Sequence, residues 1–160
     1  MRVLHINSYY SNAGKPTFYR NFFDAQVKAG LDIDVFVPVD REIDPLSKEQ
    51  FGEYSQVVKT HNPFDRFIYH LKQGKILKEA IRRYNSEKFD LIHAHSLFTN
   101  GFVAKNLSEA MGIPYIVAVR NREVNTFFRY MIHLRNTGRK IMTDAEKVIF
   151  ISEPNRDMVL

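Results

Sequence analysis

The chain has 160 residues, a formal net charge of +5, and 44% hydrophobic against 26% charged residues. This balance describes one folded domain with enough apolar side chains for a core, and it excludes a disordered chain. Because the sequence contains no Cys, disulfide bonds, thiolate metal sites and a Cys nucleophile are excluded. We expect a cytoplasmic protein, since neither a secretory signal nor a run of about 18 apolar residues is evident.

The positive charge lies in the second part of the chain. Residues 1–60 hold seven Lys and Arg against eight Asp and Glu, whereas residues 61–160 hold sixteen against ten. Such a bias attracts phosphates, anionic lipids or nucleic acids, but it selects none of them.

Strand-like and helix-like patterns alternate along the chain. Short β-branched or apolar runs predict strands, and runs with a period of 3.6 residues, many of them bounded by Pro or Gly, predict helices. The strands are expected at residues 2–6, 32–37, 54–59, 89–93, 115–119 and 147–151, and the helices at 16–29, 63–84, 97–111, 124–142 and 153–160. The third strand is expected at a sheet edge, and Pro38 is expected to end the second, because proline has no N–H for a ladder.

Two helices carry a predicted buried face. These faces are Phe18, Phe22, Ala25 and Ala29 in the first, and Phe64, Phe67, Ile68, Leu71, Leu77, Ala80, Ile81 and Tyr84 in the second. The second helix has a basic opposite face, formed by Arg66, Lys72, Lys75, Lys78, Arg82 and Arg83, and Gly74 is expected to bend it.

The alternation predicts an α/β fold, a doubly wound parallel sheet with helices on both faces. Ligands of such sheets bind at the carboxyl ends of the strands. In this chain those ends are residues 7–15, 93–96, 120–125 and 152–154.

The loop after the first strand is a candidate phosphate site. It contains Asn12, Gly14 and Lys15 and leads into a helix N-terminus, where unpaired N–H groups favour an anion. It lacks both the GxGxxG and the GK[ST] pattern. A plain surface connection is therefore the alternative.

Two histidines follow each other at strand spacing. His93 and His95 point to the same side of a strand. We expect His93 to pack in the core and His95, nearer the strand end, to face a ligand. No third ligand and no carboxylate cluster is evident nearby, so no metal site is expected.

A polar cluster follows the apolar fifth strand. It comprises Arg120, Asn121, Glu123 and Asn125 and lies where a substrate would meet the sheet. The cations of residues 120–140 alternate with Phe127, Phe128, Tyr130 and Met131. This pattern suits RNA binding or a helix with an aromatic core face, and no RNP, KH or zinc-finger pattern accompanies it.

Four segments together resemble a known family. MRVLHINSYY, FDLIHAHSLFTNGFVAKNL, IPYIVAVRNREVN and AEKVIFISEPNRDMVL are similar to the N-terminal half of family 4 retaining glycosyltransferases of the GT-B fold. The resemblance implies that residues 1–160 form a Rossmann-like acceptor-binding domain, and that the donor-binding C-terminal domain is absent from this chain. It places the loop through Gly14 near the donor phosphates, His95 near the transferred sugar, and residues 120–125 near the acceptor. Arg120 then suggests an anionic acceptor, although an ion pair with Glu123 would explain it equally well.

The resulting hypothesis is one half of a glycosyltransferase of hexosyltransferase type. It moves a sugar from a nucleoside-diphosphate donor to a glycan or lipid-linked glycan, without a metal or other cofactor, in polysaccharide or glycoconjugate assembly. The chain alone is expected to be inactive. The alternative is a non-catalytic flavodoxin-like module that binds nucleotide, RNA or an anionic surface. Nucleic acid is not expected as a partner of the transferase, whereas the basic helix face predicts peripheral contact with the inner membrane surface, with a plainly solvated face as the alternative.

Overall fold

The computed structural model describes residues 1–11, 16–44, 50–120 and 130–159. The strands are β1 (Arg2–Ile6), β2 (Asp32–Val39), β3 (Ser55–Lys59), β4 (Leu91–Ala94), β5 (Tyr115–Val119) and β6 (Lys147–Phe150). The helices are α1 (Pro16–Lys28), η1 (Pro63–Phe67), α3 (Tyr69–Tyr84), α4 (Thr99–Met111), η3 (Ile132–Leu134), α5 (Arg135–Asp144) and α6 (Glu153–Val159). The strands form one sheet in the order β3-β2-β1-β4-β5-β6, with every pair parallel. The predicted Rossmann-like sheet, with the third strand at its edge, is confirmed.

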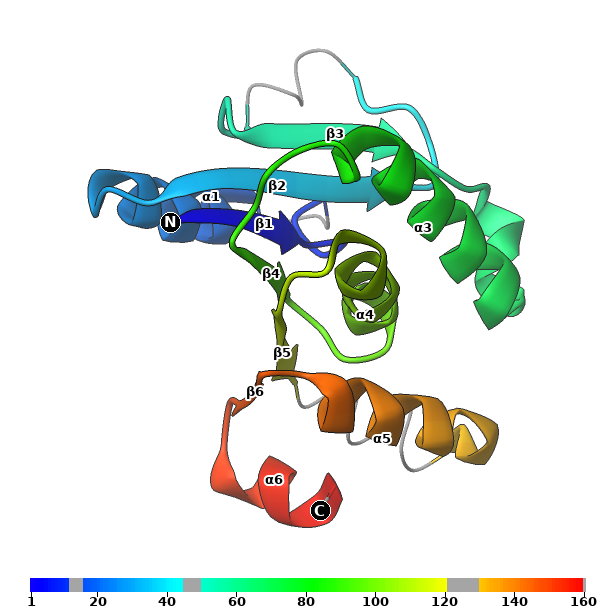
Figure 1. The fold of residues 1–160 in the computed structure, drawn as a ribbon. Helices are drawn as coiled ribbons and strands as arrows, with labels where there is room; N and C mark the ends of the chain where they lie inside the picture. Colours follow the sequence, from blue (N-terminus) through cyan, green and yellow to red (C-terminus); the bar gives the residue numbers. More distant parts are fainter. Residues whose placement is uncertain (12–15, 45–49, 121–129, 160) are drawn as a thin grey trace.

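Helices cover both faces of the sheet (Figure 1). Ile76 of α3, Leu107 of α4 and Ile141 of α5 pack with Leu4 and Ile92 on one face. The other face holds a second, smaller core in which α1 packs on β1 and β2. Gly30 and Gly112 have positive φ angles of 87° and 68°, so both end their helices as predicted.

The buried face of α1 is not the predicted one. Phe18 and Phe22 are 65% and 38% exposed, and the buried side chains are Tyr19 and Phe23, at 1% and 0%. Phe18, Tyr19, Phe22 and Phe23 form one broad aromatic arc on this helix, so the period of the apolar residues could not select which side of the arc faces the sheet.

The long second helix is divided in two. The short η1 ends before Ile68, which has extended backbone angles, and α3 then runs through Gly74 to Tyr84. The inner face of α3 is Gln73, Ile76, Ala80 and Tyr84. The prediction that Phe64, Phe67, Ile68 and Leu71 are buried is wrong, because these side chains are 81%, 74%, 59% and 45% exposed.

Two further local predictions are corrected. Pro38 lies within β2 rather than after it, because β1 has ended there: β2 pairs with β1 only as far as Phe36, and Pro38 pairs with Val58 of β3. The missing N–H therefore removes no bond to β1. Tyr130 and Met131 are 70% and 37% exposed, so the alternative of an aromatic core face is wrong for these two residues.

Candidate functional site

The candidate site lies at the carboxyl edge of β1, β4 and β5. β1 and β4 are parallel neighbours, and their register places His5 directly opposite His93. His95 follows the end of β4, and Arg120 follows the end of β5. Three strands that are far apart in the sequence thus bring imidazoles and a guanidinium to one edge, as expected for ligand sites in open α/β sheets.

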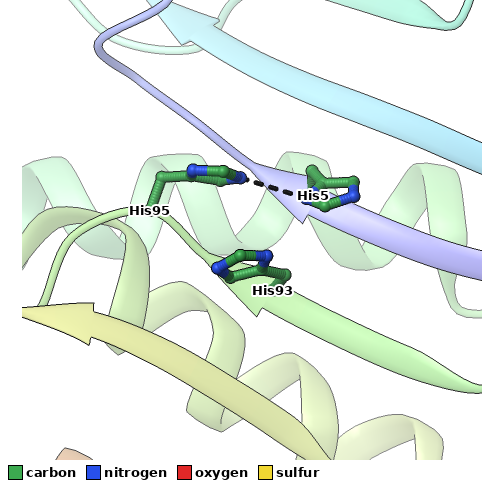
Figure 2. A group of neighbouring side chains, drawn as sticks. All are labelled: His5, His93 and His95. Atoms are coloured by element: carbon green, nitrogen blue, oxygen red, sulfur yellow. Dashed lines mark hydrogen bonds between the residues drawn. The ribbon is translucent and has the colours of Figure 1, made fainter. Parts of the chain in front are cut away.

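Three imidazole rings form a compact cluster at this edge. Figure 2 shows His5, His93 and His95 gathered where β1 and β4 end. Nδ1 of His5 and Nε2 of His95 share a hydrogen bond of 3.0 Å. The rings of His93 and His95 stack, with their centroids 4.3 Å apart and an interplanar angle of 22°. We call these residues the histidine cluster.

Aromatic residues of α1 cover the histidine cluster. The rings of Tyr19, Phe22 and Phe23 meet the His95 ring edge to face, at centroid distances of 6.1, 5.7 and 5.4 Å. His5 also packs edge to face against Phe23, at 5.0 Å. Apolar contact of this kind removes water from the two imidazoles.

The burial of His93 and His95 is the reverse of the prediction. His95 is 3% exposed, whereas His93 is only partly buried. The prediction that His95 faces a ligand and that His93 packs in the core is therefore wrong. The cause is α1, which lies over His95 with its Tyr19 and Phe23 side.

The cluster is neutral at physiological pH. Burial, followed by the charge of His93, lowers the pKa of His5 to about 3. Burial and the nearby Arg120 lower the pKa of His93 to about 4. Burial, then His93, His5 and Arg120, holds the pKa of His95 well below its ordinary value. Each ring therefore keeps one nitrogen lone pair.

Arg120 is held against α1 rather than projecting freely. Its Nη1 donates a hydrogen bond of 2.6 Å to the hydroxyl of Tyr19, and its Cζ lies 5.5 Å from the Tyr19 ring centroid. Tyr19 thus contacts both Arg120 and His95, which links the ends of β5 and β4. The alternative ion pair with Glu123 lies outside the described residues.

The turn from β4 into α4 adds a buried polar network. Asn100 Oδ1 accepts a hydrogen bond from the Ser8 backbone N–H, and Ser96 Oγ accepts one from the Asn100 N–H, each 3.2 Å long. Asn7 and Asn100 are completely buried, and the side-chain nitrogen of each makes no hydrogen bond among the described residues. This network ties the loop after β1 to the first turn of α4.

The family of the chain follows from its sequence match. The sequence pattern of glycosyltransferase family 4 matches residues 14–160. The chain belongs to glycosyltransferase family 4. The match covers most of the chain, and it includes β4, β5 and α1, which build the candidate site.

One curated relative of this family 4 chain is a bacterial glycosyltransferase of teichuronic acid biosynthesis by name. It is the putative teichuronic acid biosynthesis glycosyltransferase TuaC of Bacillus subtilis (strain 168). The two sequences are 24% identical over 172 residues, which is 95% of this chain and 44% of the relative. The family 4 chain thus spans less than half the length of this relative.

Two solved structures share the fold of this family 4 chain. The family 4 chain matches Phytolacca americana apo UGT2 with a TM-score of 0.53 and 12% identity, over 85% of this chain and 33% of that chain. It also matches UGT2 complexed with UDP-2fluoro-glucose and pterostilbene, with a TM-score of 0.52 and 10% identity, over 85% and 34%. At these identities the match concerns the fold alone.

The structure describes only part of the predicted site of this family 4 chain. It brings His95 and Arg120 to the predicted edge, joined through Tyr19. The other predicted site residues lie outside the described residues: Asn12, Gly14, Lys15, Asn121, Glu123 and Asn125. Their assigned roles stay predictions.

His5 and Asn100 belong to the site although nothing in the sequence pattern predicts them. His5 gives a signal only once β1 and β4 are known to be neighbours in register, because 87 residues of chain separate it from His93. Asn100 resembles any polar residue at the start of a helix, and only its burial singles it out.

Proposed function

We propose that this chain is the acceptor-binding, N-terminal half of a retaining glycosyltransferase. The enzyme moves a sugar of the hexose type from a nucleoside diphosphate to a glycan or lipid-linked glycan in polysaccharide or glycoconjugate assembly. The convergence of the histidine cluster, Arg120 and the hydrogen bonds of Asn100 with Ser8 and Ser96 at one sheet edge carries this proposal. The teichuronic acid name of the relative and the UDP-2fluoro-glucose in the UGT2 structure support the polymer and the donor class.

Arg120 is the main electrostatic group of the proposed reaction. Sugar transfer from a nucleoside diphosphate releases a diphosphate and passes through a cation-like sugar. A guanidinium at the sheet edge stabilises the departing negative charge, or an anionic acceptor, without a protein nucleophile or a metal-bound step. The co-substrate is the nucleotide sugar, and residues 1–160 alone are expected to be inactive.

His95 serves this site as a positioning residue. At 3% exposure its ring does not offer a surface to a sugar, but it stacks on the more exposed His93 and touches Tyr19, the partner of Arg120. We infer that His95 fixes the orientation of His93 and, through Tyr19, of Arg120.

Replacing Arg120 tests the proposed function in the complete enzyme that contains residues 1–160. Arg120→Gln is expected to lower kcat/KM for sugar transfer about 10- to 100-fold, because it removes the charge from the transition state. The matched control is Arg139→Gln, an exposed arginine of α5. Transfer of radiolabelled sugar and the melting temperature are measured for both. Equal kcat/KM for the two variants at equal melting temperature would refute the role of Arg120.

The surface at η1 supports peripheral contact with an anionic membrane. We call Phe64, Phe67, Ile68 and Leu71 the apolar patch; all four are 45% exposed or more. η1 follows the carboxyl end of β3, so the patch begins on the sheet edge that holds the candidate site. Lys72 and Lys78 of α3 supply positive charge, whereas Lys75 pairs with Asp65 at 2.7 Å and Arg82 with Glu79 at 2.7 Å. Within the described residues, no helix is long and apolar enough to cross a membrane, so contact would be at the surface.

Vesicle co-sedimentation tests this contact. The chain is expected to bind vesicles containing phosphatidylglycerol weakly at low salt and to leave them at high salt, because each cation near an anionic surface contributes about 1 kcal/mol. Phe64→Ser/Phe67→Ser is expected to abolish binding. Phe18→Ser, at an exposed phenylalanine of α1, is the control. Equal binding to phosphatidylcholine vesicles, or no effect of the double variant, would contradict membrane contact through the apolar patch.

A further inference from the structure

The histidine cluster has the composition of a transition-metal site. Three of the six histidines of the chain lie in it, and one ring nitrogen from each lies within 4.8 Å of the others. His5 comes from β1, and His93 and His95 come from β4 and its end. The expectation of no metal rested on the lack of a third ligand, and the pairing of β1 with β4 supplies that ligand in His5.

The distances suit a metal after a small contraction. In a tetrahedral zinc site, metal–nitrogen bonds of about 2.0–2.1 Å place neighbouring nitrogens about 3.3 Å apart. Nδ1 of His5 and Nε2 of His95 are already 3.0 Å apart. The ring nitrogen of His93 must therefore move closer to the other two nitrogens. His93 is partly exposed and stacks on His95 through only one ring face, so rotation about its side-chain bonds can bring its nitrogen nearer.

We propose that His5, His93 and His95 bind one divalent transition-metal ion of the zinc class, with a fourth position open to solvent on the side of His93. Imidazole ligands favour Zn²⁺, Co²⁺, Ni²⁺ and Cu²⁺ over Mg²⁺ and Ca²⁺, which prefer oxygen. The cluster contains no carboxylate. The ion is not part of the sugar transfer proposed above, and its binding does not depend on that function.

Metal binding needs a particular tautomer of each buried ring. His5 binds through Nδ1 and His95 through Nε2, the two atoms that now share one hydrogen. In the ring that carries this hydrogen, the hydrogen must pass through exchange with solvent to the other nitrogen, the one that does not bind the metal. Both rings then stay neutral, and no net proton is released. Nε2 of His5 then carries a hydrogen.

Gln26 of α1 is the group placed to receive that hydrogen. Among the described residues Nε2 of His5 is buried without a hydrogen-bond partner, and the Gln26 side chain lies next to this ring. Ligand histidines usually donate their second N–H to such an outer group, and its loss lowers metal affinity about 10- to 100-fold. Gln26 is therefore the outer-shell residue of the proposed site.

Co²⁺ titration of the untagged chain tests the site directly. Four-coordinate Co²⁺ absorbs strongly in the visible range, so one equivalent is expected to give this spectrum and Zn²⁺ is expected to displace it. His5→Phe and His93→Gln are each expected to weaken Zn²⁺ binding at least about 100-fold, and Gln26→Leu about 10- to 100-fold. His133→Gln changes an exposed histidine outside the cluster and is expected to bind as the unchanged chain does.

Two measurements keep the test decisive if a variant is unstable. Circular dichroism establishes that each variant is folded. In the unchanged chain, ¹⁵N chemical shifts of the imidazoles are expected to move on Zn²⁺ addition for three histidines and not for the other three. Absence of the visible Co²⁺ spectrum, or equal Zn²⁺ affinity in His93→Gln and His133→Gln, would overturn the proposal.

Discussion

Acidification from pH 7.5 to pH 5.0 is expected to lower the free energy of unfolding of the metal-free chain by about 4 kcal/mol through His5 and His93 alone. In the folded chain their pKa values are about 3 and about 4, whereas the unfolded rings titrate near about 6.5. At pH 5.0 the unfolded state therefore binds two protons that the folded state does not. Because pH 5.0 lies about 1.5 pH units below the unfolded pKa, each ring lowers the free energy of unfolding by about 2 kcal/mol.

The sign of this dependence follows from which state binds the protons. The contribution of these two histidines to the free energy of unfolding is fully present above about pH 6.5, where both rings are neutral in both states. It is lost as the pH falls toward the folded pKa values. Burial lowers the pKa of His95 in the same direction, and burial with Lys72 lowers that of His61. The paired carboxylates add little in this range, because their pKa values in the unfolded chain, about 3.9 for Asp and about 4.3 for Glu, lie below pH 5.0.

Urea unfolding with EDTA at the two pH values measures the effect. His5→Phe is expected to reduce the pH-dependent loss by about 2 kcal/mol, and any change in absolute stability cancels in the comparison between pH values. His133→Gln, at an exposed site, is the control and is expected to keep the full loss. An equal pH dependence in the two variants would show that His5 is not buried in its neutral form.

Gly101→Val is expected to destabilise the chain by about 3 kcal/mol, because α4 packs too closely for a side chain there. A Cβ atom at Gly101 would lie 2.9 Å from Cγ2 of Ile141, 3.1 Å from Cγ2 of Val117 and 3.2 Å from the backbone oxygen of Ser96. Ile141 and Val117 are completely buried and have little room to move. Gly101 thus allows α4 to lie against β5 and α5 beside the candidate site.

Gly74 of α3 is the matched control for helix propensity. A Cβ atom there would meet nothing within 4 Å, so Gly74→Ala is expected to stabilise the chain by about 0.5–1 kcal/mol. Gly101→Ala gains the same propensity but meets the contacts above, and is expected to be destabilising. Urea unfolding at pH 7.5 checks all three variants. A Gly101→Ala variant as stable as Gly74→Ala would contradict the close packing of α4.

The local signals of the sequence were sufficient for the sheet and for its ligand-binding edge. Most of the six strands are short apolar runs, and Gly30 and Gly112 end their helices where expected. These signals act over a few residues and need no partner. The same alternation of strand and helix requires a parallel sheet, and hence one edge where loops after the strands meet.

Which side chains are buried depended on contacts between distant segments. In α1, Phe18 and Phe22 were predicted inside, and Tyr19 and Phe23 are. Between η1 and the start of α3, four apolar residues predicted to be buried are exposed. The helix is interrupted at Ile68, and its buried side chains begin only at Gln73. Helical period cannot distinguish faces when large apolar residues occur on more than one.

The sequence by itself determined the fold class, the edge that holds the site, and the arrival of His93, His95 and Arg120 there, because strand ends in a parallel sheet are set by local pattern and chain direction. Only the tertiary structure decided that His5 joins them and that α1 buries His95. Both depend on the order and register of the strands and on the docking of a helix. These features are determined by the summed interaction energies of residues that lie far apart in the chain. A histidine triad formed from residues 5, 93 and 95 exists only after β1 and β4 have paired.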